Sequence, residues 1–235
     1  MSAEINRQNC RNLTILSGKE PTMLKEYTKI PASVNPNVKL RIIPGHFASE
    51  HSHNNYYMDF AVLKSRCSEA NGVAHLLAMH YSVDTPVDTI VCADGTKVIG
   101  TYLSEELTRS GVLSFNAHRT LYVTSPEYSN TGQIVFRDNM LPMIEGKHIL
   151  CLFGAISTGR TVEHMINSLK YYKAIPTGIC ALFSAVDEVS EIKIRSAFTI
   201  KDLPDYAMYD YGSCPMCKEG KPIDALVNSY GYSEL

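Results

Sequence analysis

A short stretch near the middle of the chain, Ser157-Thr158-Gly159-Arg160-Thr161, combines hydroxyl groups, a glycine and an arginine before a helix. The first N–H groups of a helix lack intrahelical partners and lie at the positive end of its dipole, so they favour an anion. Arg160 adds a charge that can bind an anion through two hydrogen bonds. No Gly-Lys-Ser/Thr ends the loop, which excludes a Walker loop, and the dinucleotide glycine motif is also absent. A phosphate site and an ordinary strand-to-helix turn both remain open.

The residues on either side predict the elements that hold this loop. The apolar run from Ile149 to Phe153 is typical of a strand buried on both faces. After the loop, apolar residues recur at helical spacing. These residues are Val162, Met165, Ile166, Leu169 and Tyr172. The pattern therefore predicts a strand, a loop of small residues and a helix.

Strands and helices alternate through the rest of the middle of the chain. Buried or extended strands are expected at 88–93, 119–124, 134–136 and 176–185, and helices at about 64–81 and 97–111. Lys39 to Ile43 is expected to form a short strand that ends in a turn at Pro44-Gly45. Met1 to Lys29 is expected to be polar and helical. Such alternation implies a parallel sheet with helices on both faces, with ligands at the carboxyl ends of the strands.

Composition indicates an ordinary globular protein. The chain has 235 residues, 45% of them hydrophobic and 20% charged, with a net charge of −2. This charge favours neither a nucleic-acid nor a membrane partner, and no apolar stretch approaches the roughly 20 residues of a membrane span. The odd count of seven cysteines, five of them scattered, and the lack of a signal peptide favour a cytoplasmic location.

The central loop resembles the phosphoribosyl pyrophosphate loop of type I phosphoribosyltransferases. In that family an apolar strand leads into two acidic residues and then into a Thr/Ser-Thr-Gly-x-Thr loop. The chain matches the loop over Ser157–Thr161, but Phe153 and Gly154 occupy the place of the acidic pair. The family's loop holds a 5′-phosphate, and its acidic pair serves the ribose and the reaction centre. The resemblance implies a retained phosphate site beside a damaged ribose site.

Further segments resemble orotate phosphoribosyltransferases, and the match covers roughly residues 39–185. Gly45-His46-Phe47 with Tyr56-Tyr57-Met58-Asp59 resembles the substrate segment, which implies base-binding roles for Phe47, Tyr56 and Tyr57. Asp94-Gly95-Thr96-Lys97 resembles the pyrophosphate-side loop. The stretch from Cys214 to Pro222 resembles a tail found in some members.

Each of these residues also has a simpler interpretation. Tyr56 and Tyr57 can stack on a planar base, or one can pack in the core while the other fills a surface groove. Asp94 can serve a metal or ribose, or cap the following helix. Lys97 can contact a phosphate or lie solvated on that helix.

The stretch that corresponds to the family's mobile catalytic loop departs from the family pattern. In the family this loop carries lysines and a histidine that meet the pyrophosphate of a neighbouring subunit. Here residues 122–132 contain no Lys and no His but include Glu127, with Arg119 nearby, and the substrate loop carries Glu50 without a Lys. Stabilising leaving-group charge is a main task of such sites, so these departures predict weak turnover.

Two groups of residues raise the question of a metal. His46, His51 and His53 cluster near Glu50, in a segment already explained as a substrate loop. Cys214 and Cys217 form a single Cys-x-x-Cys pair, and a structural zinc would need two further ligands, for example from a second copy of the chain. The favoured interpretation is a reduced turn, so no metal ligand is expected from the protein.

These observations predict a single α/β domain with the parallel sheet of the type I phosphoribosyltransferase fold. The core is placed at about 63–185, and a small hood at about 30–62 and 186–235. The resemblance implies a homodimer that binds phosphoribosyl pyrophosphate or a nucleoside monophosphate, with Mg²⁺ as a cofactor. Two functions remain open. One is pentosyl transfer to a pyrimidine-type base with weak or lost activity, and the other is non-catalytic nucleotide sensing. No catalytic residue is assigned.

Overall fold

The computed structural model describes residues 27–50, 52–81, 84–109, 116–117, 119–130 and 132–235. Most of the helix expected at Met1–Lys29 lies outside these residues, as do His51 and the predicted helix end at Gly111. Thr28 and Lys29 belong to a strand, β1 (Thr28–Pro31). Among the described residues, no helix is long and apolar enough to cross a membrane.

The core of the molecule is a six-stranded sheet in the order β10-β11-β9-β8-β4-β5. Its strands are β4 (Thr89–Cys92), β5 (Tyr122–Thr124), β8 (His148–Ile156), β9 (Ile175–Ser184), β10 (Glu188–Val189) and β11 (Ile192–Thr199). All neighbouring pairs are parallel apart from β10, which runs antiparallel to β11 at one edge.

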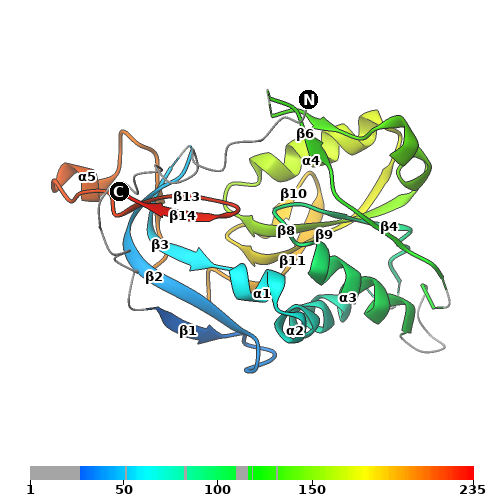
Figure 1. The fold of residues 1–235 in the computed structure, drawn as a ribbon, viewed down its shortest axis with the longest axis horizontal. Coiled ribbons are helices and arrows are strands. Elements are labelled where there is room, and N and C mark those ends of the chain that lie inside the picture. The colour runs from blue at the N-terminus through cyan, green and yellow to red at the C-terminus, as the bar shows by residue number, and fades with distance from the viewer. Residues whose placement is uncertain (1–26, 51, 82–83, 110–115, 118, 131) are drawn as a thin grey trace, which may run out of the picture.

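Helices cover both faces of this sheet (Figure 1). Side chains of α2 (Cys67–Ala78) and α3 (Lys97–Arg109) pack with Leu150 and Leu152 of β8. Side chains of α4 (Arg160–Tyr171) pack with Ile149 and Cys151 of the same strand. Successive residues of a strand point to opposite faces, which divides the apolar run between two cores. The predicted α/β fold with a parallel sheet is confirmed.

A second sheet forms the hood, in the order β12-β3-β2-β13-β14, with β1 paired to β2. Its strands after β1 are β2 (Lys39–Ala48), β3 (His53–Asp59), β12 (Met208–Tyr209), β13 (Ala225–Asn228) and β14 (Gly231–Glu234). Figure 1 shows this sheet beside the core, with β1, β2 and β3 from early in the chain and β13 and β14 from late in it. Residues 188–199, placed in the hood from the sequence, lie instead in the core sheet because β11 pairs with β9.

The turn expected at Pro44-Gly45 is wrong, because β2 continues through both residues to Ala48. The pairing of β2 with β3 shifts register between Pro44 and Phe47. A bulge of this kind tolerates a proline, which cannot donate a ladder hydrogen bond. A Cβ atom at Gly45 would lie 2.8 Å from Asp224 Oδ2, so a glycine is needed there. The expected His- and Asn-rich loop is consequently much shorter, and His53 begins β3.

Two other elements differ from the prediction in extent. The helix expected at 64–81 is divided into α1 (Ala61–Ser65) and α2, because Arg66 between them has an extended backbone. The strand expected to end at Phe153 continues to Ile156, because Ala155 and Ile156 remain paired with β9. Gly154 therefore lies inside a strand and not in a loop.

Candidate functional site

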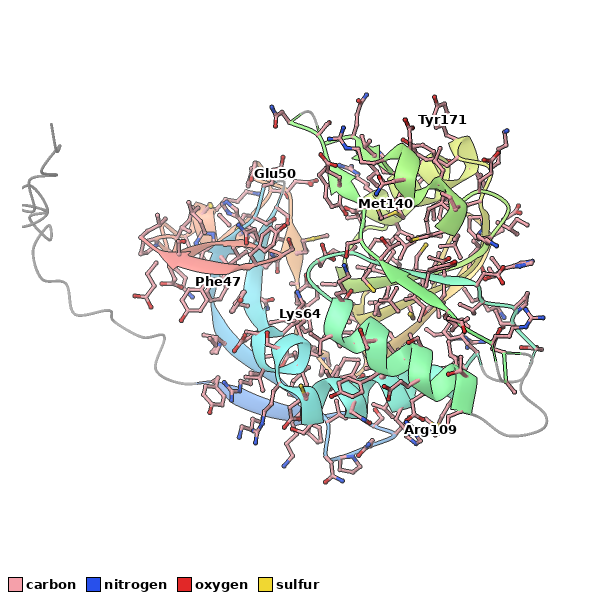
Figure 2. The ribbon with its side chains drawn as sticks, turned by 45° about the vertical axis from the view of Figure 1, so that its right-hand side comes forward. Phe47, Glu50, Lys64, Arg109, Met140 and Tyr171 are labelled. Carbon is pink, nitrogen blue, oxygen red and sulfur yellow. The ribbon has the colours of Figure 1, made fainter. Side chains whose placement is uncertain are left out.

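A cleft of ≈ 640 Å³ lies between the hood and the carboxyl ends of β4 and β8. Its walls come from the hood strand β3, the Asp94 loop, residues 155–162 and the C-terminal segments around Tyr206 and Tyr230. This is the position where open parallel sheets bind their ligands. Figure 2 shows Lys64 where the hood meets the core.

The Ser157–Thr161 loop forms one end of this cleft. It joins β8 to α4, as predicted, and Gly159 is the residue preceding the helix, with φ of 83°. That conformation is left-handed and favours glycine. Gly159 offers no side-chain cap to the first turn of α4. The N–H groups of that turn, the hydroxyls of Thr158 and Thr161, and the Arg160 guanidinium are thus suited to an anion.

Gly154, at the second position of the missing acidic pair, faces two charged groups. A Cβ atom built there would lie 3.0 Å from Lys64 Nζ and 3.1 Å from Asp94 Cβ. The Gly154 N–H donates to Asp94 Oδ2 at 3.1 Å. A carboxylate from the Asp94 loop and an ammonium from α1 therefore occupy the space above the strand at this point.

Burial and mutual attraction act on these two groups in opposite directions. Burial raises the pKa of Asp94 above its usual value, while the Gly154 N–H and the Lys64 ammonium lower it. Burial lowers the pKa of Lys64, whereas Asp94 and Asp59 raise it. Lys64 Nζ also donates to the Ser229 carbonyl at 3.1 Å, which ties α1 to the C-terminal hairpin. Lys64 and Asp94 thus form a partly desolvated pair in the cleft wall.

Phe153, at the first position of the pair, points the other way. Its side chain is 1% exposed and belongs to the core beneath α4, together with Val91 and Met165. Strand alternation explains the contrast with Gly154. A carboxylate at position 153 would enter the apolar core and not the cleft.

Aromatic residues of the hood also line the cleft. Tyr56 and Tyr57 both line it, as the sequence predicts. Phe47 does not; it is fully buried and packs behind Tyr57, with ring centroids 5.9 Å apart. Burial, Asp59 and Tyr232 raise the pKa of Tyr57 to about 12, so its hydroxyl stays protonated at neutral pH.

The structure divides the predicted pyrophosphate-side loop. Asp94 and Gly95 line the cleft, and both have positive φ, 53° and 73°. Thr96 is buried and its hydroxyl donates to the Ala93 carbonyl at 2.7 Å, which is a structural role. Lys97 is exposed at the start of α3 and does not line the cleft.

Within the stretch 122–132, β5 belongs to the core sheet and β6 (Glu127–Tyr128) pairs with the following strand β7 (Ile134–Val135) to form a two-stranded arm. The Glu127 carboxylate pairs with Arg137, whose Nε donates to it at 2.7 Å, so this anion is neutralised within the arm. Burial, Asp94 and Tyr230 raise the pKa of Tyr128 to about 12, so its hydroxyl stays protonated at neutral pH.

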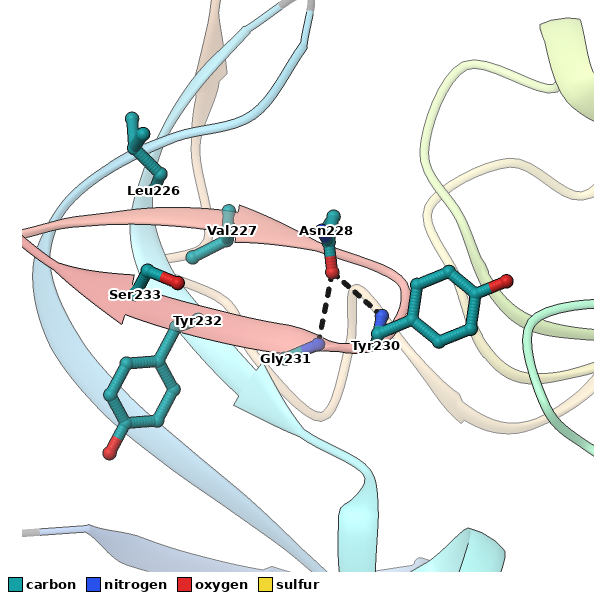
Figure 3. Close-up of a pocket in the computed structure, with 7 residues that line it drawn as sticks. All are labelled: Leu226, Val227, Asn228, Tyr230, Gly231, Tyr232 and Ser233. Carbon is teal, nitrogen blue, oxygen red and sulfur yellow. Dashed lines mark hydrogen bonds between the residues drawn. The ribbon is translucent and has the colours of Figure 1, made fainter. Parts of the chain in front are cut away.

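The hairpin of β13 and β14 reaches the cleft at its tip. Asn228 Oδ1 accepts hydrogen bonds from the N–H groups of Tyr230 and Gly231, at 2.8 and 3.1 Å, which shapes the turn (Figure 3). Tyr230 is 86% exposed and projects from this turn toward the core. A shallower hollow of ≈ 420 Å³ lies along the hairpin itself, between Leu226 and Ser233.

Several cleft residues were not predicted from the sequence. They are Lys64, Tyr206, Asp210 and Tyr230. Lys64 follows directly after the Tyr56–Asp59 segment, and that proximity is a signal that could have found it. The others come from the C-terminal third, where no local pattern indicates a return to the cleft.

The charges of the cleft bear on cofactor binding. Among the described residues that line it, the ionisable side chains other than tyrosine are three carboxylates, from Glu50, Asp94 and Asp210, and two cations, from Lys64 and Arg160. Mg²⁺ is usually held by one or two carboxylates together with phosphate oxygens and water. Asp94 already accepts a hydrogen bond from the Gly154 N–H and faces Lys64. Because Asp94 is hydrogen-bonded and paired with Lys64, the described residues do not fit a Mg²⁺ site built by the protein.

Known proteins resemble this chain over most of its length. An orotate phosphoribosyltransferase of Chlorobium phaeobacteroides is 28% identical over 187 residues, which is 78% of this chain and 88% of that protein. A second, from Chlorobaculum parvum, is 25% identical over the same shares. A transcriptional regulator, GfcR, of Methanocorpusculum labreanum is 24% identical over 62% of this chain and 72% of its own length. No protein-family model matches.

Two solved phosphoribosyltransferase structures align with most of this chain. An orotate phosphoribosyltransferase of Mycobacterium tuberculosis has a TM-score of 0.48 at 13% identity, covering 70% of this chain and 92% of that one. An adenine phosphoribosyltransferase of Thermoanaerobacter pseudethanolicus has a TM-score of 0.46 at 13% identity, covering 74% and 95%. The sequence similarity to orotate phosphoribosyltransferases, over most of both chains, confirms the expected resemblance, and the parallel core sheet with helices on both faces is the architecture that this resemblance implies.

Proposed function

We propose that the cleft binds a phosphoribosyl pyrophosphate or a nucleoside monophosphate, with its 5′-phosphate in the Ser157–Thr161 loop. The observation that carries the proposal is that this loop and the two tyrosines, Tyr56 and Tyr57, face one cleft. The loop supplies hydroxyls, helix N–H groups and Arg160 for a phosphate. The tyrosines supply flat faces for a pyrimidine-type base. The ribose then lies beside Asp94 and Lys64.

The reaction proposed for this site is transfer of the phosphoribosyl group to orotate or a similar base, at a weak rate. The bond between the ribose C1 atom and the pyrophosphate oxygen breaks, and pyrophosphate leaves with the bonding electrons. A ring nitrogen of the base bonds to C1 and releases its proton to solvent. Positive charge develops on the ribose, and Asp94 is the carboxylate placed to stabilise it. Negative charge develops on the pyrophosphate, where Lys64 is the cation that the cleft offers near Asp94.

Replacing Thr158 and Thr161 together by Val should weaken nucleotide binding at least about tenfold, because each hydroxyl bond to a charged phosphate contributes roughly 1.5–3 kcal/mol. Isothermal titration with uridine and orotidine monophosphate measures the effect. Both threonines are exposed, so the fold should be unchanged. Thr101→Val, at an exposed threonine of α3, is the matched control and should bind as the wild type does. Equal affinity of the double variant and the control would contradict a phosphate site here.

A second function, nucleotide sensing without turnover, is favoured by two observations. One is the similarity to a protein named as a transcriptional regulator. The other is that Glu127 and Arg137 neutralise each other in the arm, which leaves the arm without a free cation from this pair. A thermal-shift series with nucleoside monophosphates distinguishes a nucleotide-binding protein from one that binds no nucleotide, since a ligand that binds the native state raises the unfolding temperature. Binding without turnover supports sensing.

We also propose that the chain forms a homodimer, an expectation that rests on the resemblance alone. Light scattering coupled to size exclusion should then give about twice the chain mass of 26.1 kDa. A mass of one chain at micromolar concentration would remove the dimer, and with it any site completed by a neighbouring subunit.

A further inference from the structure

Four metal-ligating side chains meet in the hood, away from the cleft just described. They are His46, His53, Cys214 and Cys217, and their ligand atoms all lie within 4.8 Å of one another. They come from β2, from β3 and from the segment of α5 (Pro215–Lys218), at the outer end of the hood (Figure 1). His46 and Cys214 are fully buried, and His53 is 6% exposed. Cys217 lies at the surface.

The distances among these atoms suit one tetrahedral metal ion. Around Zn²⁺, with Zn–N of about 2.0–2.1 Å and Zn–S of about 2.3 Å, nitrogen and sulfur ligands lie about 3.6 Å apart and two nitrogens about 3.3 Å apart. His46 Nε2 lies 3.6 Å from both Cys214 Sγ and Cys217 Sγ. His53 Nδ1 lies 3.1 Å from Cys217 Sγ and 2.9 Å from His46 Nε2. These four distances differ from the tetrahedral values by at most about 0.5 Å, and all four ligand atoms lie within 4.8 Å of one another.

The hydrogen bonds of His46 fix which ring nitrogen faces the cluster. His46 Nδ1 lies 2.9 Å from the Lys221 carbonyl oxygen and 3.1 Å from that of Pro222. A carbonyl only accepts, so Nδ1 carries the proton and Nε2 presents its lone pair to the cluster. Metal-bound histidines typically donate their second N–H in this way. This arrangement is a second observation, independent of the four ligand atoms.

The backbone of the tail is folded so that both thiols face the histidines. Pro215 begins the single turn of α5 directly after Cys214. Gly220, with φ of 73°, then reverses the chain, and the Lys221 N–H donates to the Met216 carbonyl at 2.9 Å. This reversal brings the Lys221 and Pro222 carbonyls to His46. The sequence Cys-Pro-x-Cys followed by Gly therefore builds both the thiol pair and the support of a histidine.

We propose that His46, His53, Cys214 and Cys217 bind one structural Zn²⁺. Two thiolates balance the charge of the ion, and two neutral imidazoles complete a closed tetrahedral set. Mg²⁺ and Ca²⁺ are disfavoured, since they prefer oxygen ligands and the set contains none. With four protein ligands the ion keeps no open position, so it serves the fold and not the reaction.

Such an ion would fasten the tail to the strands that carry the base-binding tyrosines. The Tyr211 ring packs edge-on against His53, and its hydroxyl donates to the Ser49 carbonyl. Asp210, next to it, lines the cleft together with Ser49. The Zn²⁺ thereby stabilises one wall of the cleft from behind, without contacting its contents.

Metal analysis of the full chain tests the site. Protein expressed with added zinc should contain about one Zn²⁺ per chain, as measured by inductively coupled plasma mass spectrometry. Cys214→Ser and His53→Asn should each lose most of this metal. The matched controls are Cys67→Ser and His164→Asn, at an exposed free cysteine and an exposed histidine outside the cluster, and both should keep it. A chelator should lower the unfolding temperature of the wild type and of both controls.

A second measurement covers the case in which the cysteine variants do not fold. Co²⁺ added to metal-free wild-type protein should give the strong visible bands of tetrahedral coordination and a thiolate-to-metal charge-transfer band at one equivalent. Weak octahedral bands, or substoichiometric zinc in the wild type, would overturn the proposal. A Cys214–Cys217 disulfide in protein purified under reducing conditions would overturn it too, because the thiols would then serve as a redox pair.

Discussion

Phe153→Asp should unfold much of the protein, whereas Gly154→Asp, at the next residue of the same strand, should leave it folded. Phe153 is 1% exposed in the core beneath α4, and truncation of such a residue alone costs about 3–5 kcal/mol. A buried carboxylate without a partner adds a further penalty of several kcal/mol. The total approaches the whole stability of a typical domain, about 5–15 kcal/mol.

Gly154→Asp tests the same change on the opposite face of β8. The new side chain would approach Lys64, whose flexible end can move and whose charge is favourable. Its approach to Asp94 is unfavourable, and the expected cost is about 1–2 kcal/mol. Urea unfolding followed by circular dichroism measures both variants. Phe153→Leu serves as the apolar control and should lose much less than Phe153→Asp. Equal losses for the two aspartate variants would show that position 153 faces the cleft.

The pH dependence separates the charge from the lost packing. Burial would raise the folded-state pKa of the carboxyl introduced in Phe153→Asp above its unfolded value of about 3.9. The folded variant then binds a proton more readily than the unfolded chain, so its stability deficit is largest above the folded-state pKa. The deficit should shrink as the pH falls from about 8 toward about 5. Phe153→Leu should show no such change relative to the wild type.

Local patterns predict the loop but not the groups that surround it. The strand, the Ser157–Thr161 loop and α4 follow from apolar spacing over neighbouring residues, and all three are observed. The contact of Gly154 with Asp94 and Lys64 joins three segments that are remote in sequence. No periodicity encodes such a contact. The sequence therefore indicates what is missing at position 154 but not what stands in its place.

The four proposed ligands in the hood also come together through contacts that local sequence patterns do not predict. With a turn at Pro44-Gly45, as the sequence predicts, His46 and His53 lie in a loop, and their relative positions are not determined. In the structure β2 and β3 pair antiparallel, with Ala48 opposite His53, so the two imidazoles become neighbours. The Asp224 carboxylate accepts a hydrogen bond from the backbone N–H of His46 at 2.7 Å, which holds the tail against β2. The two further ligands for the cysteines thus come from the same chain and not from a second copy.

In the presence of Mg²⁺, orotate and phosphoribosyl pyrophosphate should be converted by the wild-type protein at least about 10⁴-fold more slowly than by an ordinary enzyme, for which a rate of about 10 per second is typical. The reaction places positive charge on the ribose and negative charge on the leaving pyrophosphate. Each missing stabilising interaction costs on the order of 3 kcal/mol, about a hundredfold in rate. Two are missing here, the acidic pair at 153–154 and the cations of the loop at 122–132.

The cleft compensates for these losses only in part. Asp94 supplies one carboxylate beside the ribose position, and Lys64 supplies one cation, but the pair partly neutralises itself. Gly154→Asp should therefore raise a residual rate only modestly, since the pyrophosphate still lacks its cations. Asp94→Asn should remove most of the residual rate, because it deletes the one carboxylate next to Gly154 while preserving the side-chain shape.

The decrease of orotate absorbance gives the reaction rate of the wild type, of Gly154→Asp and of Asp94→Asn. A thermal-shift assay with orotidine monophosphate tests whether each protein still binds the nucleotide. A wild-type rate of about 10 per second would show that Lys64 and Asp94 replace the missing residues fully. An equal residual rate in the wild type and in Asp94→Asn would instead show that the Asp94 carboxylate does not contribute to turnover. Because binding and turnover are measured on the same variants, loss of the ligand site and loss of catalysis give different results: the first abolishes the thermal shift, and the second leaves it intact.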